Sequence, residues 1–389
     1  MNNDKVFISL LSSFLNSNNP VLDEVPDWKY IYNLSNINNV IAIIAHEISL
    51  LQDEYKPNKE ILSVFKQQLG YTVIEFDKKC RAKEFISKTL SENEIDYMLI
   101  KGAVLSDYYP APEYRTSGDI DVIIKNDSLE KCRKIFDKFL ESGTVKYNNT
   151  GHQYEISLDY DGYNIEIHTD KDLDNQYFEN IFNLSKKCGY EFKLNDTNHL
   201  AYVICHIAKH FRHYGAGIRM FMDIDVLSRR GDCNIEKVID ICKKSGYEKF
   251  AKACLSMCKI WFNSPININY DIRNDERLRE LFENEVINAG TFGEANKRGP
   301  DYYTISGSTK IRNQKIRGLL YYLFPSINQM SLKYKFLKKH KYLLPVAWIM
   351  RIFAGFFKRK KNSMSTVSNI INPEQNTKDY LELIKELNI

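Results

Sequence analysis

Apolar residues recur at the spacing of an amphipathic helix through most of the first ninety residues of the chain. The pattern is clearest in Val6–Leu15, Val40–Leu51 and Glu60–Leu90, where apolar positions follow a period of about 3.6 residues. Pro57 and Asn58 precede the third run, and asparagine is a favoured residue for capping the start of a helix. The pattern predicts a helical N-terminal lobe over residues 1–92.

Short apolar runs and alternating positions replace this pattern between residues 93 and 170, where we expect a small mixed sheet. The pair Asp161-Gly162 is typical of a tight hairpin turn. Helical spacing in two intervening segments predicts crossover helices. The predicted strands are 95–100, 119–125, 152–159 and 163–168, and the predicted helices are 102–109 and 128–141.

Helical spacing returns after residue 195 and predicts a second set of helices. Residues 171–265 are expected to form a helical lobe that closes over the sheet, and 266–389 a basic, mostly helical region. The fold predicted for the whole chain is α+β, with a small mixed sheet flanked by N-terminal and C-terminal helical lobes. The expected helices are 195–213, 217–230, 235–245, 248–262, 276–288 and 378–387.

The composition of the 389-residue chain fits a globular protein of a reducing compartment. Hydrophobic residues make up 43% of it, and its eight cysteines include no Cys-x-x-Cys pair, which favours reduced thiols. The N-terminus lacks the features of a signal peptide. The apolar segment 342–357 is interrupted by Pro345, Arg351 and Gly355 and is too short to cross a bilayer. We therefore expect a cytoplasmic protein without a transmembrane segment.

Positive charge is concentrated near the C-terminus. The formal net charge is +4, yet residues 310–361 alone hold fourteen Lys or Arg and no Asp or Glu, so the rest of the chain is acidic. Cations interleaved with aromatic residues suit a polyanionic partner such as tRNA, or an anionic membrane surface. The alternative is a helical lobe with basic solvated faces and an aromatic core.

Two carboxylates are predicted to leave the same face of one strand. Asp119 and Asp121 are two residues apart, so on a strand their side chains share a face about 7 Å apart. Glu166 stands on another predicted strand and supplies a third carboxylate. Carboxylate oxygens are the ligands that Mg²⁺ prefers, so the three residues are candidates for metal binding and catalysis. An Asp-x-Asp pair on its own is also common on solvated strand edges.

A glycine turn stands immediately upstream of this pair. Lys101, Gly102 and Ala103 end one predicted strand and begin a helix, where backbone N–H groups can receive a triphosphate. Arg115, with Ser117 and Gly118, comes just before Asp119 and adds positive charge and backbone donors. For Lys101 the alternative is a strand-end lysine that reaches out to water.

The run from Lys101-Gly102 through Tyr109-Pro110 and Arg115 to Asp119-Ile120-Asp121 resembles the uncharacterised nucleotidyltransferase family, a bacterial family of the polymerase β superfamily. The resemblance covers roughly residues 35–230. It implies a polymerase β-like sheet, an NTP substrate and Mg²⁺, with Mn²⁺ as a substitute. It further implies metal ligation by Asp119 and Asp121, and a Glu166 that positions or activates the acceptor hydroxyl. Many members of the wider superfamily have Gly-Ser where this chain has Gly102-Ala103, so a serine contact is missing and Lys101 is the candidate for compensating charge.

Several other polar residues are candidates for the wall of a pocket. His168 shares the strand face of Glu166 and is expected to touch metal or acceptor, or else to form a structural hydrogen bond. His206, Lys209 and His210 fall on one predicted helix, where we expect a pocket wall and not a zinc site. Asp223 is expected to pair with Arg219 at i, i+4 or to orient substrate. Asp223 and Asp225 diverge by about 200° around a helix, so they cannot share a metal.

These residues predict an enzyme that transfers a nucleoside monophosphate from an NTP to an acceptor and releases pyrophosphate. The acceptor stays open among a small molecule, a glycan precursor, a peptide and tRNA. The alternative is a catalytically silent module of the same fold that binds nucleic acid or a protein through its basic C-terminal region.

Overall fold

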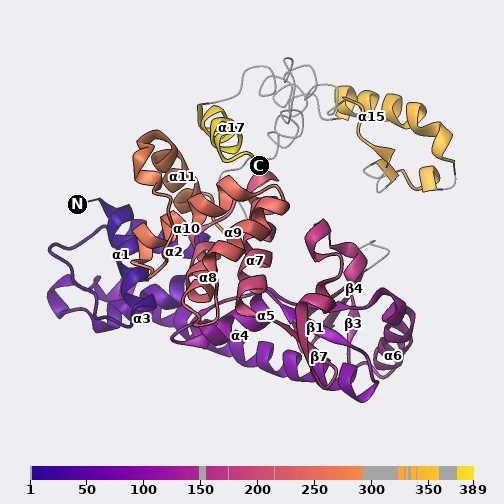
Figure 1. Cartoon of the computed structure of the whole chain (residues 1–389), viewed down its shortest axis with the longest axis horizontal. Helices are drawn as coiled ribbons and strands as arrows, with labels where there is room; N and C mark the ends of the chain where they lie inside the picture. Colours follow the sequence, from indigo (N-terminus) through magenta and orange to yellow (C-terminus); the bar gives the residue numbers. More distant parts are fainter. Residues whose placement is uncertain are drawn as a thin grey trace.

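The computed structural model describes residues 2–148, 155–173, 175–213, 215–291, 323–327, 330–331, 334–338, 340–358 and 375–389. Within these ranges the chain has a mixed sheet, and helices pack against it and beside it (Figure 1). The α+β prediction is confirmed.

The sheet has seven strands in the order β3-β4-β5-β2-β1-β7-β6. At its centre β2 pairs antiparallel with β1 and parallel with β5, and β7 pairs parallel with β1 on the other side. The strands are β1 (Tyr97–Ile100), β2 (Asp119–Ile124), β3 (Lys146–Tyr147), β4 (Glu155–Tyr160), β5 (Tyr163–Thr169), β6 (Ser185–Cys188) and β7 (Glu191–Leu194).

The predicted hairpin is present between β4 and β5. Asp161 and Gly162 both have positive φ, 53° and 77°, as a two-residue hairpin turn of the primed type requires. A second hairpin, β6–β7, was not predicted and extends the sheet past residue 170, where the sequence analysis ended it. Its strands Ser185–Cys188 and Glu191–Leu194 are mostly polar and partly exposed, so they lack the apolar alternation that marks a strand.

The N-terminal helices agree with the prediction apart from one that it missed. Asn58 caps α4, since its Oδ1 accepts a hydrogen bond from the Ile61 N–H at 3.0 Å. The missed helix, α2, has only ten residues and begins after Asp27. In Figure 1 the long α4 runs along the base of the molecule, where it contacts α3 and the sheet strands β2 and β5. The helices are α1 (Asn3–Leu15), α2 (Trp28–Ile37), α3 (Ile41–Leu50) and α4 (Lys59–Glu92).

Most helices of the middle and end of the chain lie close to their predicted positions, but α5 ends at Leu105, short of the predicted 109, and α15 was not predicted as a separate helix. The C-terminal helix α17 packs on α11 and α10, and Arg277 donates a hydrogen bond to Asp379 across that contact at 2.9 Å. The helices are α5 (Gly102–Leu105), α6 (Leu129–Glu141), α7 (Asp196–His213), α8 (Ile218–Ser228), α9 (Ile235–Lys244), α10 (Glu248–Phe262), α11 (Glu276–Asn288), α15 (Leu344–Lys358) and α17 (Gln375–Leu387).

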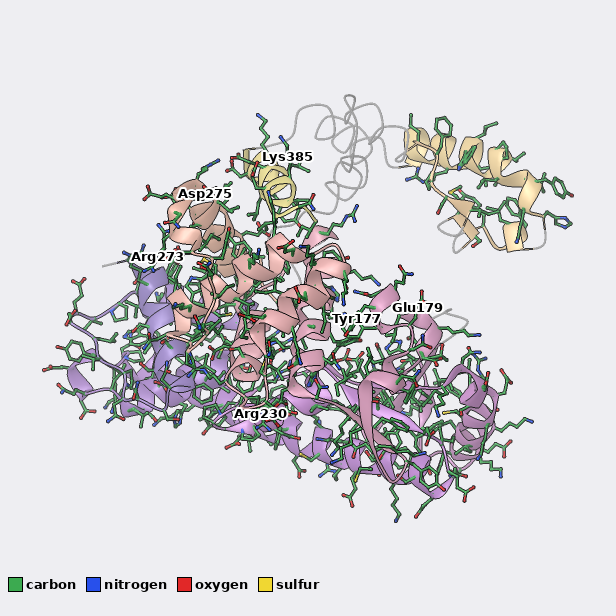
Figure 2. The ribbon with its side chains drawn as sticks, viewed as in Figure 1. Tyr177, Glu179, Arg230, Arg273, Asp275 and Lys385 are labelled. Atoms are coloured by element: carbon green, nitrogen blue, oxygen red, sulfur yellow. The ribbon has the colours of Figure 1, made fainter. Side chains whose placement is uncertain are left out.

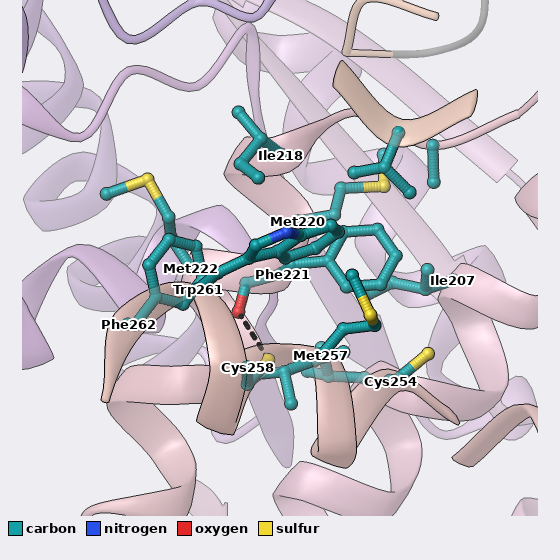
Figure 3. Close-up of a cluster of buried hydrophobic side chains, with 14 of the residues drawn as sticks. Ile207, Ile218, Met220, Phe221, Met222, Cys254, Met257, Cys258, Trp261 and Phe262 are labelled. Carbon is teal, nitrogen blue, oxygen red and sulfur yellow. Dashed lines mark hydrogen bonds between the residues drawn. The ribbon is translucent and has the colours of Figure 1, made fainter. Parts of the chain in front are cut away.

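Two apolar cores support the site from opposite sides of the sheet. One is built from α4, α6 and the sheet face that carries Ile120, Val122 and Ile165. The larger core joins the N-terminal helices to α7–α11 and α17 in one continuous cluster. Figure 3 shows part of it, where the Phe221 ring meets Trp261 edge-on at 5.5 Å and Cys258 donates to the Phe221 carbonyl. Burial on this scale fixes α8 firmly behind the site.

No helix in the described part of the chain is long and apolar enough to cross a membrane. Much of the basic stretch 310–361 lies outside the described residues, including all of 310–322 and 359–361. Of its aromatic residues, Trp348 on α15 stacks edge-on against Phe324 at 5.3 Å and donates a hydrogen bond to the Pro325 carbonyl. The eight cysteines are all free.

Candidate active site

The pairing of β2 with β5 brings the predicted carboxylates together. In this register Asp121 lies beside Glu166, Asp119 beside Asn164, and Ile123 beside His168. Because side chains alternate along each strand, these residues share one face of the sheet. The opposite face of these strands carries apolar residues of the smaller core, among them Ile120, Val122 and Ile165. The strand period therefore separates a polar site from the core across a single layer of backbone.

Three side chains on this face could hold one metal ion. Ligand atoms of Asp121, Glu166 and His168 all lie within 4.8 Å of one another. The His168 Nε2 is 3.3 Å from Asp121 Oδ1 and 3.7 Å from Glu166 Oε2. Asp119 lies on the same face but is not in this mutually close group, whereas the sequence analysis combined it with Asp121 and Glu166 and left His168 as an accessory.

Lys101 neutralises the buried carboxylate of Asp121. Its Nζ lies 2.7 Å from Asp121 Oδ1, and Asp121 is only 3% exposed. Burial by itself raises the pKa of Asp121, but the Lys101 charge and hydrogen bonds from His168 and Lys101 outweigh it and hold the pKa below its usual value. Asp121 is therefore ionised at neutral pH. Lys101 is thus not a strand-end lysine in water.

The pKa values of the neighbouring acids, Asp119 and Glu166, shift in the opposite direction and are raised. Burial raises the pKa of Asp119, and the adjacent charge of Asp121 adds to this effect. Burial, followed by the charges of Asp119 and Asp121, likewise raises the pKa of Glu166. For His168, burial lowers the pKa, but the hydrogen bond to Asp121 and its charge raise it by more. Three neighbouring, largely buried carboxyl groups favour the binding of a cation.

The turn after β1 combines a strained backbone at Lys101 with close packing at Gly102. Lys101 has a φ of 49°, which is rare for a residue with a side chain and marks local strain. A Cβ on Gly102 would lie 2.7 Å from Arg115 Nη1 and 2.8 Å from Ser117 Cβ. Ser117 is held in turn, because Tyr163 donates to its carbonyl at 2.8 Å. The segment before β2 and the turn after β1 thus pack directly together.

Arg115 is buried in an ion pair and does not extend into open space as a triphosphate ligand would. Its Nε and Nη2 donate to the two oxygens of Asp223 at 3.1 and 2.7 Å, and Tyr109 donates to Asp223 Oδ1 at 2.7 Å. Asp223 was expected to pair with Arg219 or to orient substrate. Arg219 Nη1 donates to the Thr116 carbonyl at 2.7 Å, and the charge of Asp223 also acts on the Arg219 guanidinium. α8 therefore supports the segment 115–118 through two arginine contacts.

The second Asp-x-Asp pair divides as the helical geometry predicted. Asp225 accepts from Arg229 Nε at 2.7 Å and from the Ser264 hydroxyl, on a side of α8 that does not face Asp223's partners. Arg229 also donates to Asn16 Oδ1 at 3.0 Å. Through Arg229, the Asp225 carboxylate connects α8 to Asn16 at the end of α1, so its role is structural. Nearby on the surface, Arg230 lies over the Tyr108 ring at 4.7 Å (Figure 2).

A cavity of about 180 Å³ lies beside the carboxylates, between the sheet and α7. It contains three of the predicted pocket residues, His168, His206 and Lys209. His210 lies one turn along α7, with its Nε2 3.0 Å from the Nε2 of His206. Arg219 and Asp223 are buried on α8 and are not among the lining residues. The connection after β5, on which Figure 2 labels Tyr177 and Glu179, contributes Phe178 to the wall.

Several residues of the site were not singled out from the sequence. Asn164 donates to Glu166 Oε1 at 2.9 Å and so orients that carboxylate. It stands two residues before Glu166, so the strand period alone could have placed it on the same face. The contact of Tyr109 with Asp223 carries no such local signal, because the two residues are 114 apart in the sequence.

The sequence of the chain matches the model of a known protein family. A family model described as "Uncharacterised nucleotidyltransferase" matches residues 24–263. The match covers more than half of the chain, so the chain belongs to this family. The matched range includes the whole sheet and α7 to α10.

Comparisons with individual proteins add less. A search of curated protein sequences finds no match to the chain. A solved structure described as "Structure of tRNA-processing enzyme complex 3" aligns over 76% of this chain and 89% of its own, with 13% sequence identity and a TM-score of 0.25. At that score the likeness carries no argument about fold or substrate.

Proposed function

We propose that this protein is a Mg²⁺-dependent nucleotidyltransferase that moves a nucleoside monophosphate from an NTP to an acceptor and releases pyrophosphate. The observation that carries the proposal is the β2–β5 register, which sets Asp121 beside Glu166 with Asp119 on the same face. Membership of a nucleotidyltransferase family supports the same chemistry.

The residues present fit a divalent metal. Asp119, Asp121 and Glu166 offer carboxylate oxygens, which suit Mg²⁺ and Mn²⁺, and His168 offers a nitrogen, which suits Mn²⁺ better. A divalent ion held by these residues would neutralise phosphate charge and stabilise the charge that develops during transfer. Asp121 lies beside Lys101 and His168, and the carboxylates of Asp119 and Glu166 add further negative charge, so a cation is electrostatically favoured at this place.

Glu166 is the residue that we assign to the acceptor proton. Its pKa is raised by burial and by the neighbouring carboxylates, and a base with a raised pKa is closer to the pH at which it works. Asn164 holds one of its oxygens at 2.9 Å, which leaves Oε2 directed toward the His168 side. Glu166 therefore has a fixed orientation in which to accept a proton.

The nucleotide is assigned to the Asp119 end of β2. Backbone groups of Gly102, Ala103, Ser117 and Gly118 gather there, because Gly102 packs against Ser117. Lys101 supplies the positive charge beside the carboxylates. Arg115 acts indirectly: its ion pair with Asp223 fixes the conformation of the segment that leads into Asp119.

The replacement Asp121→Asn tests this assignment. It removes one negative charge from the site, and we expect transfer from labelled NTP to fall at least about a thousandfold, as for loss of a central electrostatic contact. Asp127→Asn is the matched control, because Asp127 is an exposed acid just after the same strand. Equal transfer by Asp121→Asn and wild type would contradict the proposal.

The proposed acceptor belongs to one of four classes: a small molecule, a glycan precursor, a peptide or tRNA. Incubation with α-³²P-labelled NTPs and a cell lysate, followed by fractionation, identifies the class by the fraction that carries label. Label in RNA would favour tRNA bound through the basic stretch 310–361, whereas label in small molecules would favour a pocket-sized acceptor. The alternative of a silent binding module predicts no thermal stabilisation by any NTP with Mg²⁺.

A further inference from the structure

The chemistry assigned above uses Lys101 and His168, which line the cavity between the sheet and α7, but gives the cavity itself no ligand. Its walls include Lys101 and His168 from the sheet, and Tyr202, His206 and Lys209 from α7. We propose that this cavity binds the anionic group, a phosphate or a carboxylate, of a small acceptor whose hydroxyl receives the nucleotide. The inference rests on the proposed function and names the substrate class of the same site.

The position of the cavity along β2 is the first argument. Ser117 and Gly118 precede Asp119 at one end of the strand, whereas Ile123 and its register partner His168 line the cavity at the other end. The two carboxylates of β2 lie between them. In phosphoryl transfer the attacking and leaving oxygens stand roughly in line on opposite sides of the phosphorus. With the triphosphate at the Ser117 end, the acceptor must therefore approach from the cavity.

Charge is the second argument. Among the described residues that line the cavity there are two lysines and no carboxylate. Lys209 is exposed, so the cavity reaches the protein surface, while Lys101 lies deeper beside Asp121. A recess with positive charge and partly apolar walls concentrates anions, because the low surrounding dielectric strengthens each charge. An anionic acceptor fits this lining better than a neutral one.

The α7 wall is rigid, which is the third argument. His206 and His210 share a hydrogen bond between their Nε2 atoms at 3.0 Å. The His206 ring also lies nearly parallel to that of Tyr202, at an angle of 10°. Two neighbours thus fix the imidazole that faces the cavity. Rings held in this way give a preformed site, and preformed sites lose little entropy when a ligand binds.

The test uses the full chain with Mg²⁺ and a saturating non-hydrolysable NTP analogue. Inorganic phosphate and, separately, acetate are titrated into this complex by calorimetry. We expect one of the two anions to bind beside the analogue, and Lys209→Glu to weaken that binding about tenfold by reversing a charge in the wall. Lys244→Glu is the matched control, since Lys244 is an exposed lysine on α9 away from the cavity.

Each outcome separates this inference from the proposed function. Binding of phosphate alone assigns a phosphate-bearing acceptor, and binding of acetate alone assigns a carboxylate. If the analogue binds but neither anion does, or if Lys244→Glu weakens binding as much as Lys209→Glu, the acceptor site is wrong and the proposed function stands. If the analogue displaces the anion, the cavity belongs to the triphosphate. Failure of every analogue to bind with Mg²⁺ would instead overturn the proposed function.

Discussion

Lys101 is the residue on which the electrostatics of the site depend. Its ammonium group lies against Asp121, where a divalent ion would also have to approach the carboxylate. The strained backbone at this position indicates that the surrounding structure holds Lys101 there at a free-energy cost of about 1–3 kcal/mol. We infer that Lys101 is the counter-ion of Asp121 in the metal-free protein and that a divalent ion would compete with it for this carboxylate.

Replacement of Lys101 by Met separates this role from simple structural support. Without the ammonium group, the charge of Asp121 is left buried, so the metal-free protein should lose about 3–5 kcal/mol of stability. The same loss removes a competing cation, so Mn²⁺ affinity should rise about tenfold or more, as measured by Mn²⁺ electron paramagnetic resonance and by the metal-dependent shift in melting temperature.

The matched control is Lys125→Met. Lys125 Nζ forms a similar ion pair with Asp96 at 2.6 Å, outside the site, so its loss should leave Mn²⁺ affinity unchanged. A lower Mn²⁺ affinity in Lys101→Met would mean that Lys101 helps to assemble the metal site and does not compete with the metal.

At the scale of elements, the site is the contact between a turn and a strand. The turn after β1 and the segment before β2 contact each other at Gly102 and Ser117. On its other side this segment is bound to α8, because Arg115 pairs with Asp223 and Arg219 donates to the Thr116 carbonyl. The geometry of the carboxylates thus depends on a loop that is fixed from both sides.

Gly102→Ala measures how tight this contact is. The added methyl group would lie 2.7 Å from Arg115 Nη1 and 2.8 Å from Ser117 Cβ, so one neighbour must shift, and we expect a loss of about 1–3 kcal/mol in unfolding free energy. Urea denaturation provides the measurement. Gly118→Ala is the control, because a Cβ there meets nothing within 4 Å. Similar losses in both variants would show that backbone entropy, not packing, decides the effect.

Local patterns predict the elements well and the contacts between them poorly. Asp119 and Asp121 could be placed on one face because a strand has a period of two. The register that sets Asp121 beside Glu166 joins β2 to the more distant β5, and no local pattern predicts it. The Arg115–Asp223 pair joins residues 108 apart in sequence, and no local pattern encodes it. The polar hairpin β6–β7 was missed because half-exposed strands carry little apolar signal.

At the scale of the whole molecule, one large core joins the two ends of the chain. α1 packs on α10, α2 on α11, and α17 on α11, so helices from the beginning and end of the sequence are buried together. The smaller core beneath the sheet is separate from it. Damage to the large core would therefore reach the site through α7, which lines the cavity, and through α8, which contacts the segment 115–118.

Glu47 connects the stability of this core to pH. It lies on α3 at 1% exposure, 3.9 Å from His46, and among the described residues its Oε2 has no hydrogen-bond partner. Burial raises the pKa of Glu47 from 4.5 to about 8. The folded state thus keeps a proton that the unfolded chain releases, so stability is fully present below the unfolded pKa and is lost as pH rises through the folded one.

Glu47→Gln should remove this pH dependence. Wild type is expected to lose up to about 1.4 kcal/mol per pH unit between the two pKa values, from one proton of linkage, and the glutamine variant should lack that contribution and be more stable at pH 8. Urea denaturation from pH 5 to 8 measures it, and comparison with wild type cancels the groups that titrate in both proteins. Glu54→Gln, at an exposed site nearby, should follow wild type. Parallel pH profiles for Glu47→Gln and wild type would mean that Glu47 is ionised in the folded core, with its charge stabilised by His46.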